Sequence, residues 1–341
     1  MIPIIYSDRL QQNKNKTVLA GDLGATKVNL ALYKINGRDI LIIRSRQYYC
    51  REYGSLKEIV QDFVKGHDEK PHSICVGVAG AVIDNKAGIV NLGWMVDGEE
   101  VRIATGIDNV ALINDLEANA YGLAYLQDED MITIHEGEKH KGNMAIIAPG
   151  TGLGEAGLYW DGKFYHPFAT EGGHCDFSPR TDVDFELTKY FLQKEGIPSW
   201  DRVISGPGIH TIYNFLRDEK KFEEPEWLKE EFDEENPSAA ISEAAINNKA
   251  AICVETMQLF TRYFARECSN LVLKMKATGG LFLGGGIPPK ILQLIQTKMF
   301  IDNYFDCDRQ QDLVSLVPIK LIRNDKAALL GALYYGACAM E

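Results

Sequence analysis

Leu19–Val28, the stretch LAGDLGATKV, places a carboxylate, small residues and a threonine where a strand should turn. Residues 17–22 and 28–35 on either side are rich in β-branched and apolar residues, which predicts a β-hairpin. The same turn has the composition that lets backbone N–H groups approach a phosphate, with Thr26 as a hydroxyl and Asp22 as a carboxylate beside a metal ion. It is not a Walker loop, because no G-x-x-x-x-G-K-[ST] pattern occurs in the chain. An ordinary hairpin and a phosphate loop both remain open.

The order of strand, glycine-rich turn and strand recurs over residues 143–162, NMAIIAPGTGLGEAGLYWDG. Between the two hairpins, residues 55–66 have the periodicity of an amphipathic helix, and residues 73–80 form an apolar strand. Residues 109–115 predict a further strand that runs directly into a helix, so Asp115 lies at a strand-to-helix junction. Hairpins followed by βαβ units indicate mixed sheets, and the recurring pattern suggests two related halves.

The C-terminal half is mainly helical. Residues 241–277 form the longest helical region, and residues 279–292 predict a strand, a glycine turn and a helix whose first turn suits Pro288 and Pro289. The charged segment 217–240 has no sustained apolar face, so it predicts a solvated loop or short helices, and no chemistry is assigned to it.

Composition limits the possible functions. The 341 residues favour two domains, and 45% hydrophobic with 25% charged residues is typical of a soluble globular protein. No apolar run reaches transmembrane length and the N-terminal residues turn polar too early for a secretory signal, so no membrane association and a cytoplasmic location are expected. A net charge of -12 argues against nucleic acid as a partner, and an anionic ligand would need local neutralisation by backbone N–H groups, a lysine or Mg²⁺.

The seven cysteines are scattered and contain no C-x-x-C pair. This pattern indicates reduced thiols and no structural zinc site.

Six motifs then occur in a distinctive order between about Val18 and Tyr335: DLGATK, IND followed by EA, APGTGLGEA, EGGHCDF, SGPG and GGLFLGGGIPP. In order and spacing the chain resembles the bacterial glucokinases, in the hexokinase branch of the actin-like ATPase superfamily. The resemblance implies an α/β, two-domain actin-like ATPase (ribonuclease H-like) fold with a deep interdomain cleft and mixed sheets flanked by helices. It places a small domain at 1–124, to which 322–341 return, and a large domain at 125–321. The implied activity is ATP-dependent phosphorylation of glucose at its 6-hydroxyl, and a homodimer is the family expectation.

For the nucleotide, the resemblance makes the first hairpin turn a phosphate loop in which Asp22 holds Mg²⁺ through water. The family's double glycine and asparagine are replaced here by Ala25 and Lys27, and Lys27 either adds a cation beside the phosphates or points to solvent, the second being slightly favoured. The second hairpin turn is the other phosphate loop, and a glycine turn receives adenosine. The implied ATP-binding residues are Asp22, Gly24, Thr26, Lys27, Gly150, Thr151, Gly152, Gly284, Gly285 and Gly286. For any one glycine, an ordinary turn is the alternative.

The resemblance implies that catalysis depends on Asp115. An aspartate that opens a helix is usually only an N-cap. In the family's N-D-x-x-A position it takes the proton from the sugar 6-hydroxyl as that oxygen attacks the γ-phosphate, so that a free alkoxide never forms. Asn114 beside it can hydrogen-bond a sugar hydroxyl but cannot accept that proton.

The sugar site implied by the resemblance also includes the E-G-G-H clamp and a covering loop. Its residues are Asn91, Trp94, Asn114, Asp115, Glu171, His174 and Asp201. Asp201 stands where the family usually has glutamate, and its shorter side chain leaves about one methylene of reach unfilled, which weakens the expectation of strict glucose specificity. Trp94 could equally be an ordinary packed aromatic, and a metal at His174 is not expected because His and Cys in adjacent positions are no recognisable ligand set.

Two other functions stay open. A kinase for another hexose or amino sugar, as in the ROK group, is disfavoured because the C-x-C-G zinc cluster of that group is absent. A sugar-sensing protein without turnover is disfavoured because the sixteen residues before Thr17 leave no room for a helix-turn-helix. Polyphosphate is an alternative to ATP as the donor.

Overall fold

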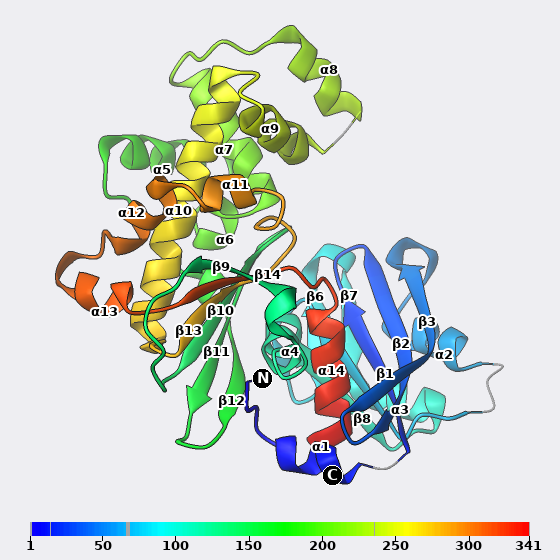
Figure 1. Cartoon of the computed structure of the whole chain (residues 1–341). Coiled ribbons are helices and arrows are strands. Elements are labelled where there is room, and N and C mark those ends of the chain that lie inside the picture. Colours follow the sequence, from blue (N-terminus) through cyan, green and yellow to red (C-terminus); the bar gives the residue numbers. More distant parts are fainter. Residues whose placement is uncertain (1, 14, 66–68, 235, 341) are drawn as a thin grey trace. The chain divides into compact units, whose positions relative to one another are not determined.

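The computed structural model describes residues 2–13, 15–65, 69–234 and 236–340. The chain forms two compact units (Figure 1). Unit 1 comprises Met1–Asp130, Ala156–Ala169 and Asn324–Glu341, and unit 2 comprises Met131–Glu155 and Thr170–Arg323. The domains expected at 1–124 with 322–341, and at 125–321, stay a prediction, and residues 1, 14, 66–68, 235 and 341 of them lie outside the described residues.

Unit 1 contains a five-stranded sheet in the order β3-β2-β1-β4-β8. Its strands are β1 Lys16–Leu23, β2 Lys27–Asn36, β3 Asp39–Tyr49, β4 Ser73–Val78 and β8 Asn109–Asn114. β1 pairs antiparallel with β2 and parallel with β4, and β4 pairs parallel with β8. The predicted first hairpin and mixed sheet are therefore confirmed.

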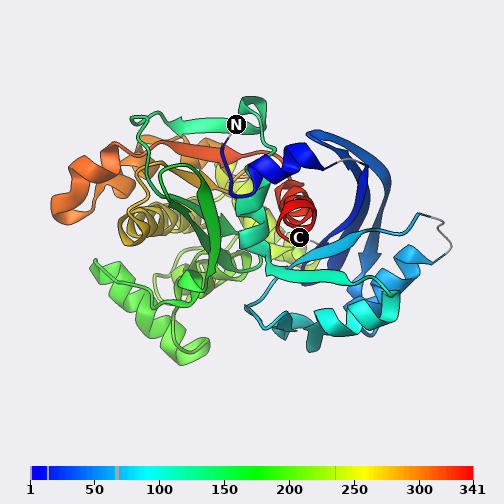
Figure 2. The same cartoon turned by 90° about the horizontal axis from the view of Figure 1, so that it is seen from below.

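Helices and a small antiparallel sheet complete unit 1. They are α1 Ser7–Gln12, α2 Leu56–Val64, α3 Gly98–Thr105, α4 Asp115–Gly122, α14 Ala327–Cys338, β5 Val82–Ile83, β6 Lys86–Ile89 and β7 Trp94–Asp97. α14, the red helix of Figure 1 and Figure 2, packs against α4 and β1. At Gly331 a Cβ atom would overlap the carbonyl oxygen of Ala118, so α14 and α4 touch through their backbones.

Unit 2 is built on a six-stranded sheet in the order β12-β11-β10-β13-β14-β9. The strands are β9 Met131–His135, β10 Met144–Pro149, β11 Leu153–Trp160, β12 Tyr165–Thr170, β13 Gly280–Leu283 and β14 Ile319–Ile322, and residues 156–169 of the β11–β12 hairpin are grouped with unit 1. β13 pairs parallel with both β10 and β14, while β9 is antiparallel to β14. β10 and β11 form the second predicted hairpin.

Nine helices accompany this sheet in the described part of unit 2. They are α5 Asp182–Lys194, α6 Trp200–Val203, α7 Gly206–Asp218, α8 Glu226–Glu234, α9 Pro237–Ile246, α10 Ala251–Met275, α11 Leu292–Ile295, α12 Lys298–Phe305 and α13 Gln311–Ser315. The core centres on α10, where the buried Arg266 donates to Asp184 at 2.7 Å. Short 3-10 turns occur at Cys50–Glu52, Val90–Leu92, Asp128–Asp130, Gly172–His174 and Asp308–Gln310.

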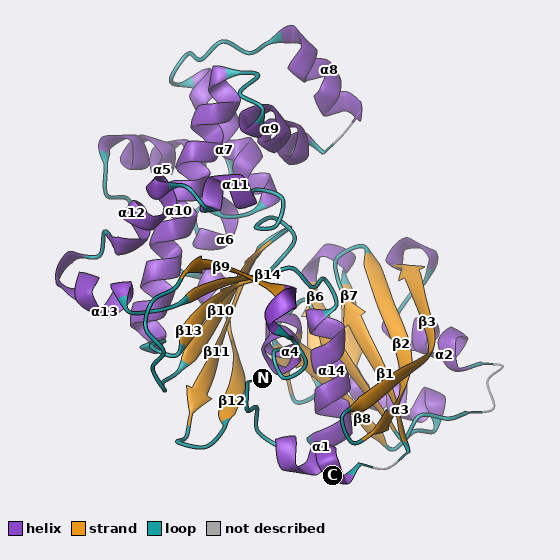
Figure 3. Ribbon diagram, in the orientation of Figure 1, coloured by secondary structure: helices purple, strands orange, loops and turns teal. Residues whose placement is uncertain are grey.

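The region 241–277 is helical, as expected. It consists of α10 and the end of α9, which are separated at residues 247–250, where Asn248 has a φ of 53° (Figure 3). A second expectation for the helices was wrong. Pro288 and Pro289 lie in turns before α11, which begins only at Leu292. The charged segment does form short helices, as expected.

In the described part of the chain, no helix combines the length and apolar character needed to cross a membrane.

Candidate active site

The first predicted phosphate loop is the turn between β1 and β2. Gly24 N donates to Lys27 O at 3.0 Å, and Thr26 O accepts from Cys50 N at 2.9 Å, which ties the turn to the end of β3. Ala25 has no positive φ, so the loop tolerates alanine where glycine is usual. Lys27 Nζ lies 5.4 Å from the centroid of the Tyr49 ring, so its cation lies over an aromatic face.

Asp22 lies in β1, immediately before this turn. Burial raises the pKa of its carboxyl above the usual range, and a hydrogen bond with the Asn29 side chain opposes the shift. A nearby cation would favour the ionised form of such a buried carboxyl. Among the described residues no group of three or more His, Cys, Asp or Glu side chains could hold a metal. A single carboxylate suits Mg²⁺ that keeps most of its water, so the site fits the predicted ion.

Asp115 is the first residue of α4, and Asn114 is the N-cap. Asn114 Oδ1 accepts from Leu116 N at 2.9 Å and from Glu117 N at 3.2 Å, while its Nδ2 donates to Gly80 O at 3.2 Å. The alternative in which Asp115 serves as the N-cap is therefore wrong. Asp115 is half-buried, and its Oδ1 accepts from Leu116 N at 2.8 Å. The predicted contact between Asn114 and a sugar stays a prediction.

Asp22 and Asp115 lie at the same edge of the five-stranded sheet. Asp22 pairs with Gly77 of β4, which in turn pairs with Ile113 of β8, two residues before Asp115. A Cβ at Gly77 would lie 3.1 Å from the Cβ of Ala118, so the glycine lets the first turn of α4 approach the strand. The carboxyl ends of parallel strands are where ligands bind in α/β sheets. No role for Gly77 was predicted, although a glycine inside a strand indicates a close approach of another chain segment.

Asn91 and Trp94 occupy one short segment of unit 1. Asn91 is exposed in the Val90–Leu92 turn, and Trp94 opens β7, where it pairs with Ile89. Trp94 is half-buried against the core of unit 1. Its position suits both a covering loop and an ordinary packed aromatic, so the predicted sugar contacts stay predictions.

The second predicted phosphate loop, with Thr151 at its exposed tip, joins two other motifs in unit 2. Gly150 N donates to Gly152 O, and Gly150 O accepts from Gly206 N, both at 2.8 Å. Gly206 begins α7, so the S-G-P-G motif brings a helix N-terminus to this loop, where it favours anions.

The predicted adenosine turn, Gly284–Gly286, lies against the same loop. Gly285 has a φ of 82°, and a Cβ there would lie 2.5 Å from Pro149 O, so only glycine fits. Ile287 N donates to Pro149 O at 3.2 Å. Three motifs far apart in the sequence are thus brought together.

Asp201 has a contact that the sequence did not predict. Its Oδ1 accepts from Leu153 N at 2.6 Å, and a Cβ at Gly152 would lie 2.5 Å from the same oxygen. The carboxylate therefore lies on the backbone of the second phosphate loop. The predicted contact of Asp201 with the sugar stays a prediction.

Asp201→Ala should raise the KM for ATP about tenfold, because a buried N–H left without its acceptor costs about 1–3 kcal/mol. Leu153 is buried, so water does not replace the lost carboxylate. Asp201→Asn keeps an acceptor oxygen and should stay within about threefold of the parent. Steady-state kinetics with each substrate varied in turn checks this. A rise in the KM for glucose alone would instead assign Asp201 to the sugar.

The E-G-G-H motif follows β12. Glu171 Oε2 and His174 Nε2 lie 3.7 Å apart, and both side chains are more than half exposed. The two glycines between them are closely packed, because a Cβ at Gly172 would overlap the Glu155 carboxylate and one at Gly173 would overlap Leu153 O. The structure thus brings the two predicted clamp residues together, open to a ligand.

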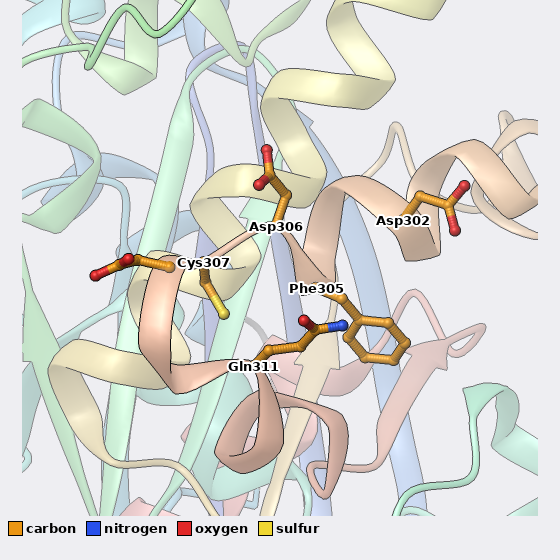
Figure 4. Close-up of a pocket in the computed structure, with 6 residues that line it drawn as sticks. Asp302, Phe305, Asp306, Cys307 and Gln311 are labelled. Atoms are coloured by element: carbon orange, nitrogen blue, oxygen red, sulfur yellow. The ribbon is translucent and has the colours of Figure 1, made fainter.

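A pocket of about 460 Å³ lies elsewhere, around the end of α12 (Figure 4). It is lined by Asp302, Phe305, Asp306, Cys307, Asp308 and Gln311. None of these is a predicted site residue.

Comparison with known proteins agrees with these motifs. A family model described as Glucokinase matches residues 19–338. A glucokinase of Nostoc punctiforme is 38% identical over 331 residues, which cover 92% of this chain and 97% of that protein. The crystal structure of a glucokinase from an Antarctic psychrotroph has a TM-score of 0.79 at 26% identity and covers 94% of this chain and 98% of that chain.

A ROK family glucokinase from Streptomyces griseus, solved in complex with glucose and AMPPNP, has a TM-score of 0.60 at 19% identity, covering 93% of this chain and 97% of that chain. At that identity the likeness shows the fold alone. The predicted α/β fold of the actin-like ATPase class is confirmed, and the chain belongs to the glucokinase family.

Proposed function

We propose that the chain transfers the γ-phosphate of MgATP to the 6-hydroxyl of glucose with Asp115 as the general base. ATP-dependent phosphorylation of glucose is the activity of the family to which the chain belongs. One observation supports the role of Asp115 above all. Asn114 caps α4, and Asp115 stands beside that cap at the sheet edge that also carries Asp22.

The base reaction needs a carboxylate at this position. As the sugar oxygen bonds to the γ-phosphorus, its proton passes to Asp115 and the bond to the leaving ADP breaks. The half-buried position keeps the carboxylate accessible to a hydroxyl while limiting its contact with water.

Charge on the phosphates would be met by the backbone N–H groups of the two turns and by the N-terminus of α7. Asp22 would hold Mg²⁺ through water, and the ion would supply further neutralisation of the phosphate oxygens. Thr26 and Thr151 would donate hydroxyl hydrogen bonds, and the glycines at 284–286 would let adenosine lie against backbone. A homodimer and a cytoplasmic location are proposed on the family expectation.

A coupled ADP-release assay over a panel of hexoses tests the function. Glucose should be the preferred substrate, and ATP should be preferred over polyphosphate as the donor. Turnover with mannose or glucosamine and none with glucose would replace the proposal with a kinase for another sugar. Glucose binding without ADP release would indicate a sugar-sensing protein.

Glucose alone should change the tryptophan fluorescence, because Trp94 lies on the segment proposed to cover the sugar. The change should be lost in Trp94→Phe and kept in Trp200→Phe. Trp200 is a matched control, since it is 3% exposed and packs against Phe177 in the core of unit 2. A titration of each variant with glucose measures this, with calorimetry to show that the sugar still binds. A fluorescence change that persists in Trp94→Phe would mean that Trp94 is an ordinary packed aromatic.

A further inference from the structure

Beneath the E-G-G-H motif lies a buried acidic residue to which the proposed mechanism gives no role. Glu155, in β11, has a fully buried side chain, and its Oε2 occupies the space that a Cβ of Gly172 would need. Its backbone is tied to the same loop, since the Thr170 hydroxyl donates to Glu155 O at 2.9 Å and Gly172 N donates to the Thr170 hydroxyl at 3.3 Å. Glu155 thus packs directly against the backbone of the loop between Glu171 and His174.

The charges around Glu155 do not balance. A second fully buried carboxyl, Glu267 of α10, is within hydrogen-bonding reach of it. The nearest cation is Lys274, whose Nζ lies 2.7 Å from Glu267 Oε1 but 4.0 Å from Glu155 Oε2. Asn270 Nδ2 donates to the other oxygen of Glu267 at 2.8 Å. One cation therefore lies beside two buried carboxyls, and it pairs with Glu267, the nearer of the two.

A proton on Glu155 resolves this imbalance. An ionised buried carboxylate requires hydrogen-bond donors at its oxygens. Neither carboxyl oxygen of Glu155 has such a donor among the described residues. A protonated Glu155 can instead donate to Glu267. Burial first, and the charge of Glu267 second, raise the pKa of Glu155 from 4.5 to about 8, with Lys274 opposing the shift.

We propose that Glu155 is a positioning residue of the glucose site, which in its neutral, protonated form supports the Gly172 backbone and so sets the spacing of Glu171 and His174. The inference rests on the proposed role of these two residues in binding glucose. When Glu155 loses its proton, a second buried negative charge faces Glu267 without its own cation. The carboxylate must then move toward water, and the loop that rests on it moves too.

The sign of the pH effect follows from this arrangement. The neutral form, which dominates below the raised pKa of about 8, supports the loop, and the ionised form above it does not. If only the neutral form binds glucose, the KM for glucose rises about tenfold between pH 7 and pH 9, because one pH unit above a pKa leaves about one molecule in eleven protonated.

Other titratable groups lie close to Glu155 on the helix and the loop that pack around it. α10 contributes Glu267, Lys274 and Cys268, and Cys175, on the loop that carries the exposed Glu171 and His174, lies near Lys274. Burial lowers the pKa of Lys274, but the hydrogen bond to Glu267 and the charges of Glu267 and Glu155 together outweigh burial, so the pKa is raised above its usual 10.5. Burial is the chief cause that raises the pKa of Cys268 well above 9.0. Neither Lys274 nor Cys268 therefore titrates between pH 7 and pH 9. Cys175→Ser removes the exposed thiol next to the clamp and serves as the control.

The experiment measures the KM for glucose, the KM for ATP and kcat from pH 7 to pH 9. The parent and Cys175→Ser should show the tenfold rise in the KM for glucose, without a matching rise in the KM for ATP. Glu155→Gln, which is always neutral, should show a flat profile. Glu267→Gln should also give a flat profile, but at the raised KM for glucose, because Lys274 is then free to pair with a Glu155 that is ionised across the whole range. This variant tests the inference if Glu155→Gln does not fold.

A parent profile that is flat, or a rise that persists in both glutamine variants, overturns the inference. Failure of the proposed function looks different, because no variant would then release ADP in response to glucose at pH 7.

Discussion

Asp115→Asn is expected to lower kcat by a factor of about 10²–10⁴, the usual contribution of a positioned general base. The amide has nearly the shape of the carboxylate and can still accept from Leu116 N, as Asp115 Oδ1 does at 2.8 Å. It cannot accept the proton of the sugar hydroxyl. Because Asn114 is the N-cap of α4, the helix keeps its cap in the variant. The loss should therefore fall on kcat, with glucose binding largely retained.

Glu117→Gln is the matched control for this prediction. Glu117 is a second carboxyl in the same helical turn, and burial raises its pKa. The substitution again replaces a carboxyl by its amide, but at a residue with no proposed part in catalysis, so kcat should change by less than about threefold. Single-turnover and steady-state assays at saturating glucose measure both variants. Near-parent kcat in Asp115→Asn, or equal losses in the two variants, would remove Asp115 from the role of base.

Gly331→Ala is expected to lower the free energy of unfolding by about 3 kcal/mol, at the upper end of the cost of overpacking. The added methyl would overlap the carbonyl oxygen of Ala118 and lie 2.8 Å from Gly122 N. Both obstacles are backbone atoms of α4, which cannot rotate away as a side chain can. The reciprocal contact is also close, because a Cβ at Gly122 would overlap Ala327 O. The two helices would have to separate along their whole contact.

Gly336→Ala, in the same helix, provides the comparison. There the new methyl would meet side-chain atoms, with Val18 Cγ1 at 2.8 Å and Cys75 Cβ at 3.1 Å, and a valine rotamer can adjust. We expect a cost of about 1 kcal/mol. Urea denaturation followed by circular dichroism ranks the two variants. Equal midpoints for both would mean that α14 shifts along α4 at little cost.

Much of the architecture could be predicted from local sequence. The two glycine turns flanked by apolar runs predicted both hairpins, and the run from residue 109 into an acidic helix start predicted the junction at Asp115. The identity of the cap could not be predicted, because Asn114 and Asp115 are both good N-cap residues. The break between α9 and α10 was also missed, although the two asparagines at 247 and 248 are residues that often end a helix.

The finer features of the site depend on contacts between distant residues. The carboxylate of Asp201 reaches the backbone of Leu153, and nothing in either local sequence indicates that pairing. Glu155 stands in a strand where a charged residue would be expected to face solvent, and only Glu267 and Lys274, more than a hundred residues later, explain its burial. The S-G-P-G motif contributed to the family resemblance, but its serine and proline, which mark the start of a helix, were not used to predict a helix N-terminus beside the second loop.

The position of α14 in the chain has a consequence for biosynthesis. Ser73 donates to Gly336 O at 2.7 Å and Asn13 donates to Ala337 O at 2.9 Å, so the helix covers strands that are translated long before it. Unit 1 returns to itself at Asn324 only after residues 170–323 have been made, which takes on the order of 10–30 s at about 5–20 residues per second. During that interval the apolar surface around Val18 and Cys75 emerges from the ribosome without its cover. We therefore expect chaperones to bind the nascent segment that precedes α14, and a truncated product without α14 to be degraded, because both leave this apolar face exposed.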